Sequence, residues 1–216
     1  MAIYIPNGST ISIASTYGAP TNTTAVSNAT EAVATVVSAT GITQGGIVEV
    51  TSGWSKLNGR IARVKTLASL AATLEKIDTS NVSKFPAGSG IGSVRPITAW
   101  TQITQVLDSD STGGDQAFTT YSFLEDATER QIPTNKSAQG FTLDLGDDAN
   151  LPWFDLLSVA DDDKLPRAIR VSLSGGGVIY YNCFCTLNKT PSLKKNEVAK
   201  LRATFSLVAD VTRYAS

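Results

Sequence analysis

The sequence contains no histidine among its 216 residues and only two cysteines. Histidine is the commonest general base and metal ligand in proteins, and it completes the Ser/His and Cys/His nucleophile pairs. Its absence excludes those kinds of catalysis and leaves carboxylates as the candidate acid–base groups. Zinc binding is disfavoured as well, because two cysteines would need two further ligands from carboxylates.

The two cysteines, Cys183 and Cys185, stand two positions apart in a strand-like segment. Side chains at such positions point to the same face of a strand, which is poor geometry for a disulfide between them. We therefore expect both to be free thiols packed in the core.

Long apolar runs are also missing. No segment approaches the roughly 18 apolar residues that cross a bilayer, and residues 1–8 lack the basic and apolar regions of a secretion signal. Charged residues make up only 17% of the chain, and the net charge is -1. These features predict a soluble, cytoplasmic product with no membrane partner.

The few charges are unevenly distributed. Residues 22–93 hold six Lys/Arg and four Asp/Glu (net +2), residues 94–148 hold three and nine (net -6), and residues 149–216 hold nine and six (net +3). An acidic middle between basic parts suits head-to-tail association. Taken alone, the charge pattern favours the simpler interpretation, in which surface charge keeps a monomer soluble.

Turn signals divide the chain into three predicted parts. Residues 1–21 form an uncharged N-terminal arm with a first strand over residues 9–15, and such an arm needs a partner surface. Residues 22–93 form a small inserted β module, with strands over residues 32–38, 46–51, 60–65 and 72–77. The module ends in a Gly-rich flexible connector over residues 85–92.

Residues 94–216 form the larger predicted domain. Its strands cover residues 98–107, 117–123, 137–145, 167–174, 178–187 and 199–211, with a hairpin turn at residues 175–177. The one helix lies near residues 150–161, with an Asn150 cap, Pro152 in the first turn and apolar residues at positions 153, 156, 157 and 160. The fold class is mainly β, an antiparallel β-sandwich or part-barrel with one flanking α-helix.

The strand over residues 178–187 is apolar on both faces. Cys183 and Cys185 share one face with other apolar residues, while Tyr180 and Phe184 add apolar bulk to the other. The second face needs cover, either from a neighbouring subunit or from the helix of the same chain.

Two acidic clusters flank the helix: Asp144, Asp147 and Asp148 before it, and Asp161, Asp162 and Asp163 after it. Glycoside hydrolysis would need two acids in a cleft lined with aromatics, but the three tryptophans are scattered in core-like patterns, and Trp153 lies on the helix's apolar stripe.

Negative charge at a helix C-terminus opposes the macrodipole unless a base compensates it. Lys164, Arg167 or the Lys194–Lys195 pair can do so, within the subunit or across an interface.

We hypothesise that Asp161, Asp162, Asp163, Lys194 and Lys195 form an inter-subunit contact. A solvated turn is the simpler alternative. No basic stripe interleaved with aromatics is present and the pI is about 5.5, so tight DNA binding is not expected.

Several segments carry a resemblance, although none of them is a chemical motif. The chain resembles the major tail tube protein of long-tailed, non-contractile bacteriophages over essentially its whole length. The matching segments are residues 10–15, 17–19, 51–60, 127–134, 151–153, 195–198 and 203–208.

The resemblance implies the tail tube fold and a structural virion protein with no catalytic residue and no cofactor. It implies hexameric rings that stack into a hollow tube around a tape measure protein, with tail terminator and tail-tip proteins as further partners. It further implies that phage DNA passes through the lumen to the host cell and that the tail is assembled in the cytoplasm of the bacterial host.

A lumen that conducts DNA should not bind phosphate, so an acidic wall is expected. Glu125, Asp126 and Glu129 flank a predicted hairpin and are the candidate lumen residues, although they fit an exposed turn equally well. The N-terminal arm and the segments 107–116 and 80–92 are candidate loops that become ordered when rings stack.

Three alternatives remain open. A monomeric binding module, for example one that binds carbohydrate, predicts exposed aromatics. A glycoside hydrolase predicts paired acids in a cleft. A tail terminator or a capsid decoration protein predicts a closed ring or trimer that never elongates.

Overall fold

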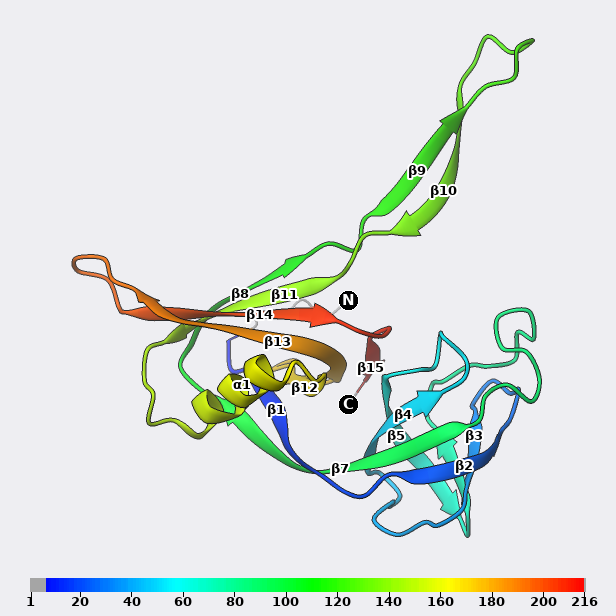
Figure 1. Cartoon of the computed structure of the whole chain (residues 1–216), viewed down its shortest axis with the longest axis horizontal. Helices are drawn as coiled ribbons and strands as arrows, with labels where there is room; N and C mark the ends of the chain where they lie inside the picture. Colours follow the sequence, from blue (N-terminus) through cyan, green and yellow to red (C-terminus); the bar gives the residue numbers. More distant parts are fainter. Residues whose placement is uncertain (1–6, 216) are drawn as a thin grey trace.

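The structure, a computed structural model, describes residues 7–215. All strand pairings between these residues are antiparallel, and the described chain is mainly β with a single helix, as the sequence predicts (Figure 1). The elements are β1 (Thr10–Tyr17), β2 (Thr21–Val26), β3 (Val33–Val36), β4 (Ile47–Ser52), β5 (Arg60–Ala68), β6 (Ala71–Leu74), β7 (Gly92–Ile103), β8 (Val106–Thr112), β9 (Gln116–Tyr121), β10 (Arg130–Lys136), β11 (Gly140–Gly146), α1 (Pro152–Asp163), β12 (Arg167–Ser172), β13 (Val178–Ser192), β14 (Lys200–Leu207) and β15 (Thr212–Tyr214).

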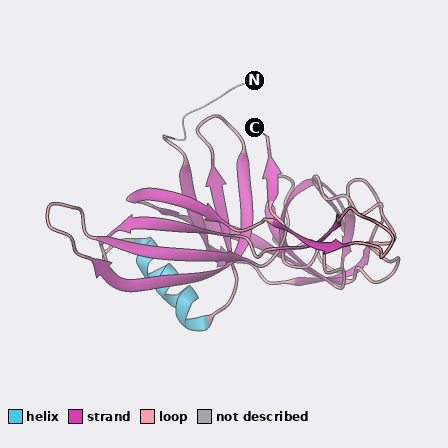
Figure 2. Cartoon of the chain, turned by 90° about the horizontal axis from the view of Figure 1, so that it is seen from above, coloured by secondary structure: helices cyan, strands magenta, loops and turns pink. Residues whose placement is uncertain are grey.

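The larger sheet runs in the order β7-β1-β12-β13-β14-β11-β8. The helix α1 packs beneath this sheet, at the end of the molecule away from strands β2 to β6 (Figure 2). Trp153, Leu157 and Ala160 of α1 are buried in a core shared with these strands. The predicted apolar stripe and the core role of Trp153 are therefore confirmed. The helix therefore covers one face of the larger sheet only.

Cys183 and Cys185 lie in the same core as free thiols, as predicted. Burial raises the pKa of both thiols, that of Cys185 to about 12. At neutral pH they stay protonated and act as small apolar side chains.

Six strands close into a small barrel. The pairings run β2-β3-β6-β5-β4-β7, and β7 pairs back with β2, so that this unit has no free strand edge. Its own core contains Trp54, Leu57 and Leu74. The four strands predicted for the inserted module correspond to β3 to β6, but β2 was missed, because its inward-facing Thr23 gives no apolar alternation.

The barrel and the larger sheet share a strand and a third core. The first half of β7 pairs within the barrel, and its second half pairs with β1. Between the two units, Ile61 and Ile97 pack with Tyr180 and Tyr214. The division of the chain at residues 21 and 93 stays a prediction.

The Gly-rich segment 85–92 is a packed loop rather than a free connector. Phe85 meets Trp54 edge-on at 5.3 Å between ring centroids, and the Trp54 indole N–H donates to the Pro86 carbonyl at 2.8 Å. A Cβ at Gly90 would lie 2.8 Å from the Trp54 ring. The glycine is needed for close packing, so the prediction of a flexible connector is wrong.

The first strand predicted over residues 9–15 is present as β1, but the described part of the N-terminal segment is not an arm that needs a partner surface. β1 lies between β7 and β12 and pairs with both, and its Ile11, Ile13 and Ala14 are buried. The lack of charge in this segment reflects burial in the chain's own sheet, not a partner surface elsewhere. Residues 1–6 of the arm lie outside the described residues.

The predicted loop over residues 107–116 is largely a strand. β7 ends at Ile103, the backbone turns at Gln105 with φ 57°, and β8 then pairs with β11. The polar sequence of β8 shows no apolar alternation, which an edge strand with one neighbour tolerates. The single predicted strand over residues 98–107 is therefore two strands.

The helix begins and ends later than predicted. Its N-cap is Leu151 without a side-chain bond, while the Asn150 amides donate to the Asp148 carboxylate at 3.0 and 3.2 Å. The Asn150 cap is wrong, but Pro152 stands in the first turn as expected. Asp161 to Asp163 form the last turn of α1 rather than following it.

The second face of β13 is covered in part by the barrel. α1 lies on the Cys183 and Cys185 face, so the alternative that the helix covers Tyr180 and Phe184 is wrong. Tyr180 is buried in the junction core, whereas Phe184 is 45% exposed. Cover of Phe184 by a neighbouring subunit stays a prediction.

Candidate assembly surfaces

Four strands form a sheet with one covered and one open face, which we call the outer sheet: the part of β13 from Cys183 to Ser192, then β14, β11 and β8. Its apolar face packs on α1. Its open face carries two cross-strand rows of polar side chains, Asp108-Asp144-Arg202-Asn188 and Asp110-Thr142-Thr204-Thr186. We call this the polar face.

Asp144 is the central charge of the polar face. It accepts hydrogen bonds from Arg202 Nε and Lys200 Nζ, both at 2.9 Å, and these bonds hold its pKa at about 2. Asp108 stands directly opposite Asp144 on β8, an unfavourable pairing of like charges that the two bases offset. Both bases are thus engaged with a carboxylate of their own chain.

The outer sheet has a free edge on each side among the described residues. β8 pairs with β11 alone, and β13 has no partner on its β12 side beyond Cys183. Unpaired N–H and C=O groups along an edge are a template for another strand. The two edges are different strands, so copies that join through them do so in a head-to-tail manner.

The predicted hairpin is present as β9 and β10, and it projects from the body of the molecule (Figure 1). Glu125, Asp126 and Glu129 lie in its tip loop, where Asp126 pairs with Arg130 at 2.9 Å. The structure thus brings the three candidate lumen residues together. Large apolar side chains are exposed beside them, with Phe123 at 53% and Leu124 at 106%.

Two of the three acids at the end of α1 have ion-pair partners within the chain. Asp163 pairs with Arg167, one of the bases proposed from the sequence, and Asp162 lies 3.6 Å from Lys189, which was not proposed. Lys194 instead pairs with Glu197 at 3.6 Å, in the same β13–β14 loop as Lys195. The inter-subunit role of these residues stays a prediction.

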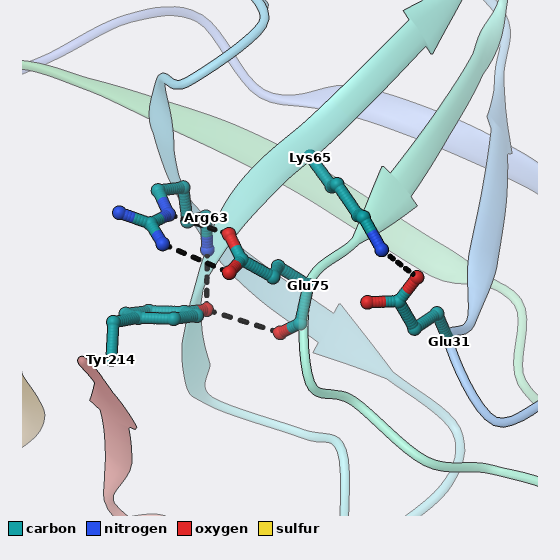
Figure 3. Close-up of polar contacts among 5 residues, drawn as sticks. All are labelled: Glu31, Arg63, Lys65, Glu75 and Tyr214. Atoms are coloured by element: carbon teal, nitrogen blue, oxygen red, sulfur yellow. Dashed lines mark hydrogen bonds and ion pairs between the residues drawn. The ribbon is translucent and has the colours of Figure 1, made fainter. Parts of the chain in front are cut away.

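A polar cluster fastens the C-terminal strand to the barrel (Figure 3). The Tyr214 hydroxyl accepts from the Arg63 amide at 2.7 Å and donates to the Glu75 carbonyl at 3.2 Å. The Arg63 guanidinium lies 4.4 Å from the Tyr214 ring centroid and pairs with the Glu75 carboxylate. Lys65 and Glu31 form a second ion pair nearby at 2.6 Å.

A groove of about 600 Å³ lies where the barrel meets the base of the hairpin. Its lining includes Lys56 and Lys136, together with Val208 and Asp210 from the segment after β14. Sequence reasoning missed this groove, because its residues come from three distant segments and share no motif. The fold alone brings the two lysines to one surface.

Among residues 7–215, no three His, Cys, Asp or Glu side chains gather in a way that could hold a metal ion. In the same part of the chain, no helix is long and apolar enough to cross a membrane.

Residues 52–216 match the family model described as "Phage tail tube protein, TTP". Because the match spans most of the sequence, the chain belongs to the phage tail tube protein family, whose members are structural components of the phage tail. A search of curated proteins gave no match.

Among solved structures, the chain is similar to an anti-feeding prophage cap that terminates the tube, with 20% identity, 50% of this chain and 79% of that chain covered, and a TM-score of 0.36. It is also similar to two proteins of an extracellular contractile injection system called PVC. One is the sheath/tube terminator in the extended state (19% identity, 49% of this chain and 84% of that chain covered, TM-score 0.35). The other is from the sheath-tube complex (18% identity, 50% and 80% covered, TM-score 0.35).

Proposed function

We propose that this chain is the tail tube subunit of a long-tailed, non-contractile phage, and that it assembles into hexameric rings stacked as a hollow tube. The observation that carries this proposal is the outer sheet, which has a free edge on each side. Pairing of β8 in one copy with the open edge of β13 in the next removes both edges and extends the sheet. Six copies, the number that the family resemblance implies, then close a β-lined ring.

The polar face is suited to the channel wall. Since α1 covers the apolar face, a closed ring leaves the polar face to line its interior. Arg202 and Lys200 are paired with Asp144, so they offer little free positive charge to DNA phosphates. A wall that neutralises few phosphates lets DNA slide through. The lumen role of Glu125, Asp126 and Glu129 stays a prediction, and the channel wall proposed here does not depend on it.

The partners follow from the tube. We infer a tape measure protein inside it during assembly, a tail terminator and tail-tip proteins at its ends, and assembly in the cytoplasm of the bacterial host. Phage DNA passes through the lumen on its way to the host cell without being specifically bound.

The monomeric binding module has less support. A carbohydrate-binding barrel needs exposed aromatic rings for sugar stacking, but Trp54 and Phe85 of the barrel are 2% and 7% exposed. The exposed Phe118 and Phe123 lie on the projecting hairpin instead. A tail terminator or a capsid decoration protein is distinguished from a tube subunit by its assembly, because it forms a closed ring or trimer that does not elongate.

Negative-stain electron microscopy of the purified protein at rising concentration, together with sedimentation, tests the proposal. Hollow tubes or stacked rings are the expected result. Single rings at every concentration would favour a terminator, and a monomer at every concentration would favour the binding module, which glycan binding then checks.

A further inference from the structure

The tip of the β9–β10 hairpin carries a combination of charge and apolar surface that its own chain does not cover. Glu125 and Glu129 are exposed at the tip next to Leu124. Asp126 is already neutralised by Arg130. An isolated two-stranded hairpin is marginal in water, so exposed apolar side chains at its end indicate a contact with something else.

The groove between the barrel and the hairpin base has the complementary character. Lys56 and Lys136 lie in it exposed, with no ion-pair partner among the described residues. Val208, which is 41% exposed, supplies an apolar wall. Asp210 is the one acid that lines the groove.

We propose that this groove is the docking site for the hairpin tip of a second copy of the chain, with Glu125 and Glu129 facing Lys56 and Lys136 and with Leu124 on the Val208 wall. A hairpin cannot reach the groove of its own chain, because Lys136 stands at the base from which the hairpin projects (Figure 1). The tip and the groove are different surfaces, so the contact is heterologous and repeats from copy to copy.

This inference rests on the proposed tube and names the contact that links each copy to the next along it. It places Glu125 and Glu129 at a subunit interface rather than on the channel wall. The edges of the outer sheet then close the rings, and the tip contact stacks them.

A charge swap tests the contact. The groove variant Lys56→Glu/Lys136→Glu and the tip variant Glu125→Lys/Glu129→Lys should each raise the concentration needed for tube formation roughly tenfold or more. Both variants should still form single rings. The chain that carries all four substitutions should form tubes again near the wild-type concentration, since opposite charges face each other once more.

The matched control joins the tip variant to Lys84→Glu, an exposed barrel lysine outside the groove. This chain should not recover. Thermal unfolding of every variant shows whether it is folded. Two outcomes would overturn the contact while leaving the proposed tube intact. In one, the groove variant forms tubes like the wild type. In the other, the chain with all four substitutions is folded but still impaired in tube formation. A wild-type chain that forms neither rings nor tubes would instead overturn the proposed function and the contact with it.

Discussion

At the scale of single residues, ionisation of Tyr214 should weaken the contact between the barrel and the larger sheet. Burial raises its pKa from 10.0 to about 12, and its hydroxyl bonds both Arg63 and Glu75. The folded state thus prefers the neutral phenol. The resulting stabilisation is complete below pH 10 and is lost as the pH rises towards 12, by about 2–3 kcal/mol in total.

We therefore predict that Tyr214→Phe lowers the free energy of unfolding at neutral pH by about 1–3 kcal/mol, because the Arg63 amide loses its acceptor. The same substitution should flatten the decline in stability between pH 10 and 12. Urea unfolding at several pH values measures both effects. Tyr121→Phe on the hairpin is the control, and an unchanged alkaline slope in Tyr214→Phe would contradict the assignment.

Asp144 gives a prediction of the opposite sign. Its pKa is lowered from 3.8 to about 2 by Arg202 and Lys200. The ionised Asp144 therefore contributes fully to the free energy of unfolding above pH 4, and this contribution is lost as the pH falls towards 2. Because Arg202 is largely exposed, solvent limits this contribution to about 1 kcal/mol. Asp144→Asn should remove it, whereas Asp110→Asn should not, as acid unfolding curves of the two variants would show. Equal acid profiles for both variants would count against the Asp144 network.

At the scale of elements, closure of the barrel depends on a close approach of two strands. A Cβ at Gly92, the first residue of β7, would lie 2.1 Å from the Thr51 carbonyl oxygen of β4. Gly92→Ala should therefore force β4 and β7 apart and lower the free energy of unfolding by about 1–3 kcal/mol. Gly88→Ala, where a Cβ meets nothing within 4 Å, tests the same loop through backbone strain alone, because Gly88 has φ +78°. A stable Gly92→Ala barrel would show that the strands can move apart at little cost.

The elements that the sequence predicted well are those with a regular apolar pattern. The stripe of α1, the alternation of β14 and the Gly175–Gly177 turn all have local physical causes, and they are present. Among the elements that were missed, β2 and β8 are polar strands held by their neighbours. The Thr23 hydroxyl accepts a hydrogen bond from the Gly92 amide at 2.8 Å, and β8 pairs with β11. These strands depend on pairing with strands that are distant in the sequence, and a local stretch of sequence does not show such pairing.

At the scale of the whole molecule, the sequence predicted the fold class and, through the resemblance, the family. It did not predict how the parts sit together. The sharing of β7, the position of β1 between two strands and the meeting of Lys56 with Lys136 all depend on contacts between distant segments. The two free edges of the outer sheet likewise become visible only once the strand order is known.

The central claim is that copies of this chain join through the edges of the outer sheet. The Ser109 amide of β8 bonds the Asp108 carboxylate at 2.8 Å rather than β11, so Ser109→Pro should spare the β8–β11 pairing and block the outer edge. Ser109→Ala keeps the amide and is the matched control. Negative-stain electron microscopy of the two variants beside the wild type tests the claim: we predict tubes for Ser109→Ala and none for a folded Ser109→Pro, whereas tubes of Ser109→Pro at the wild-type concentration would contradict it.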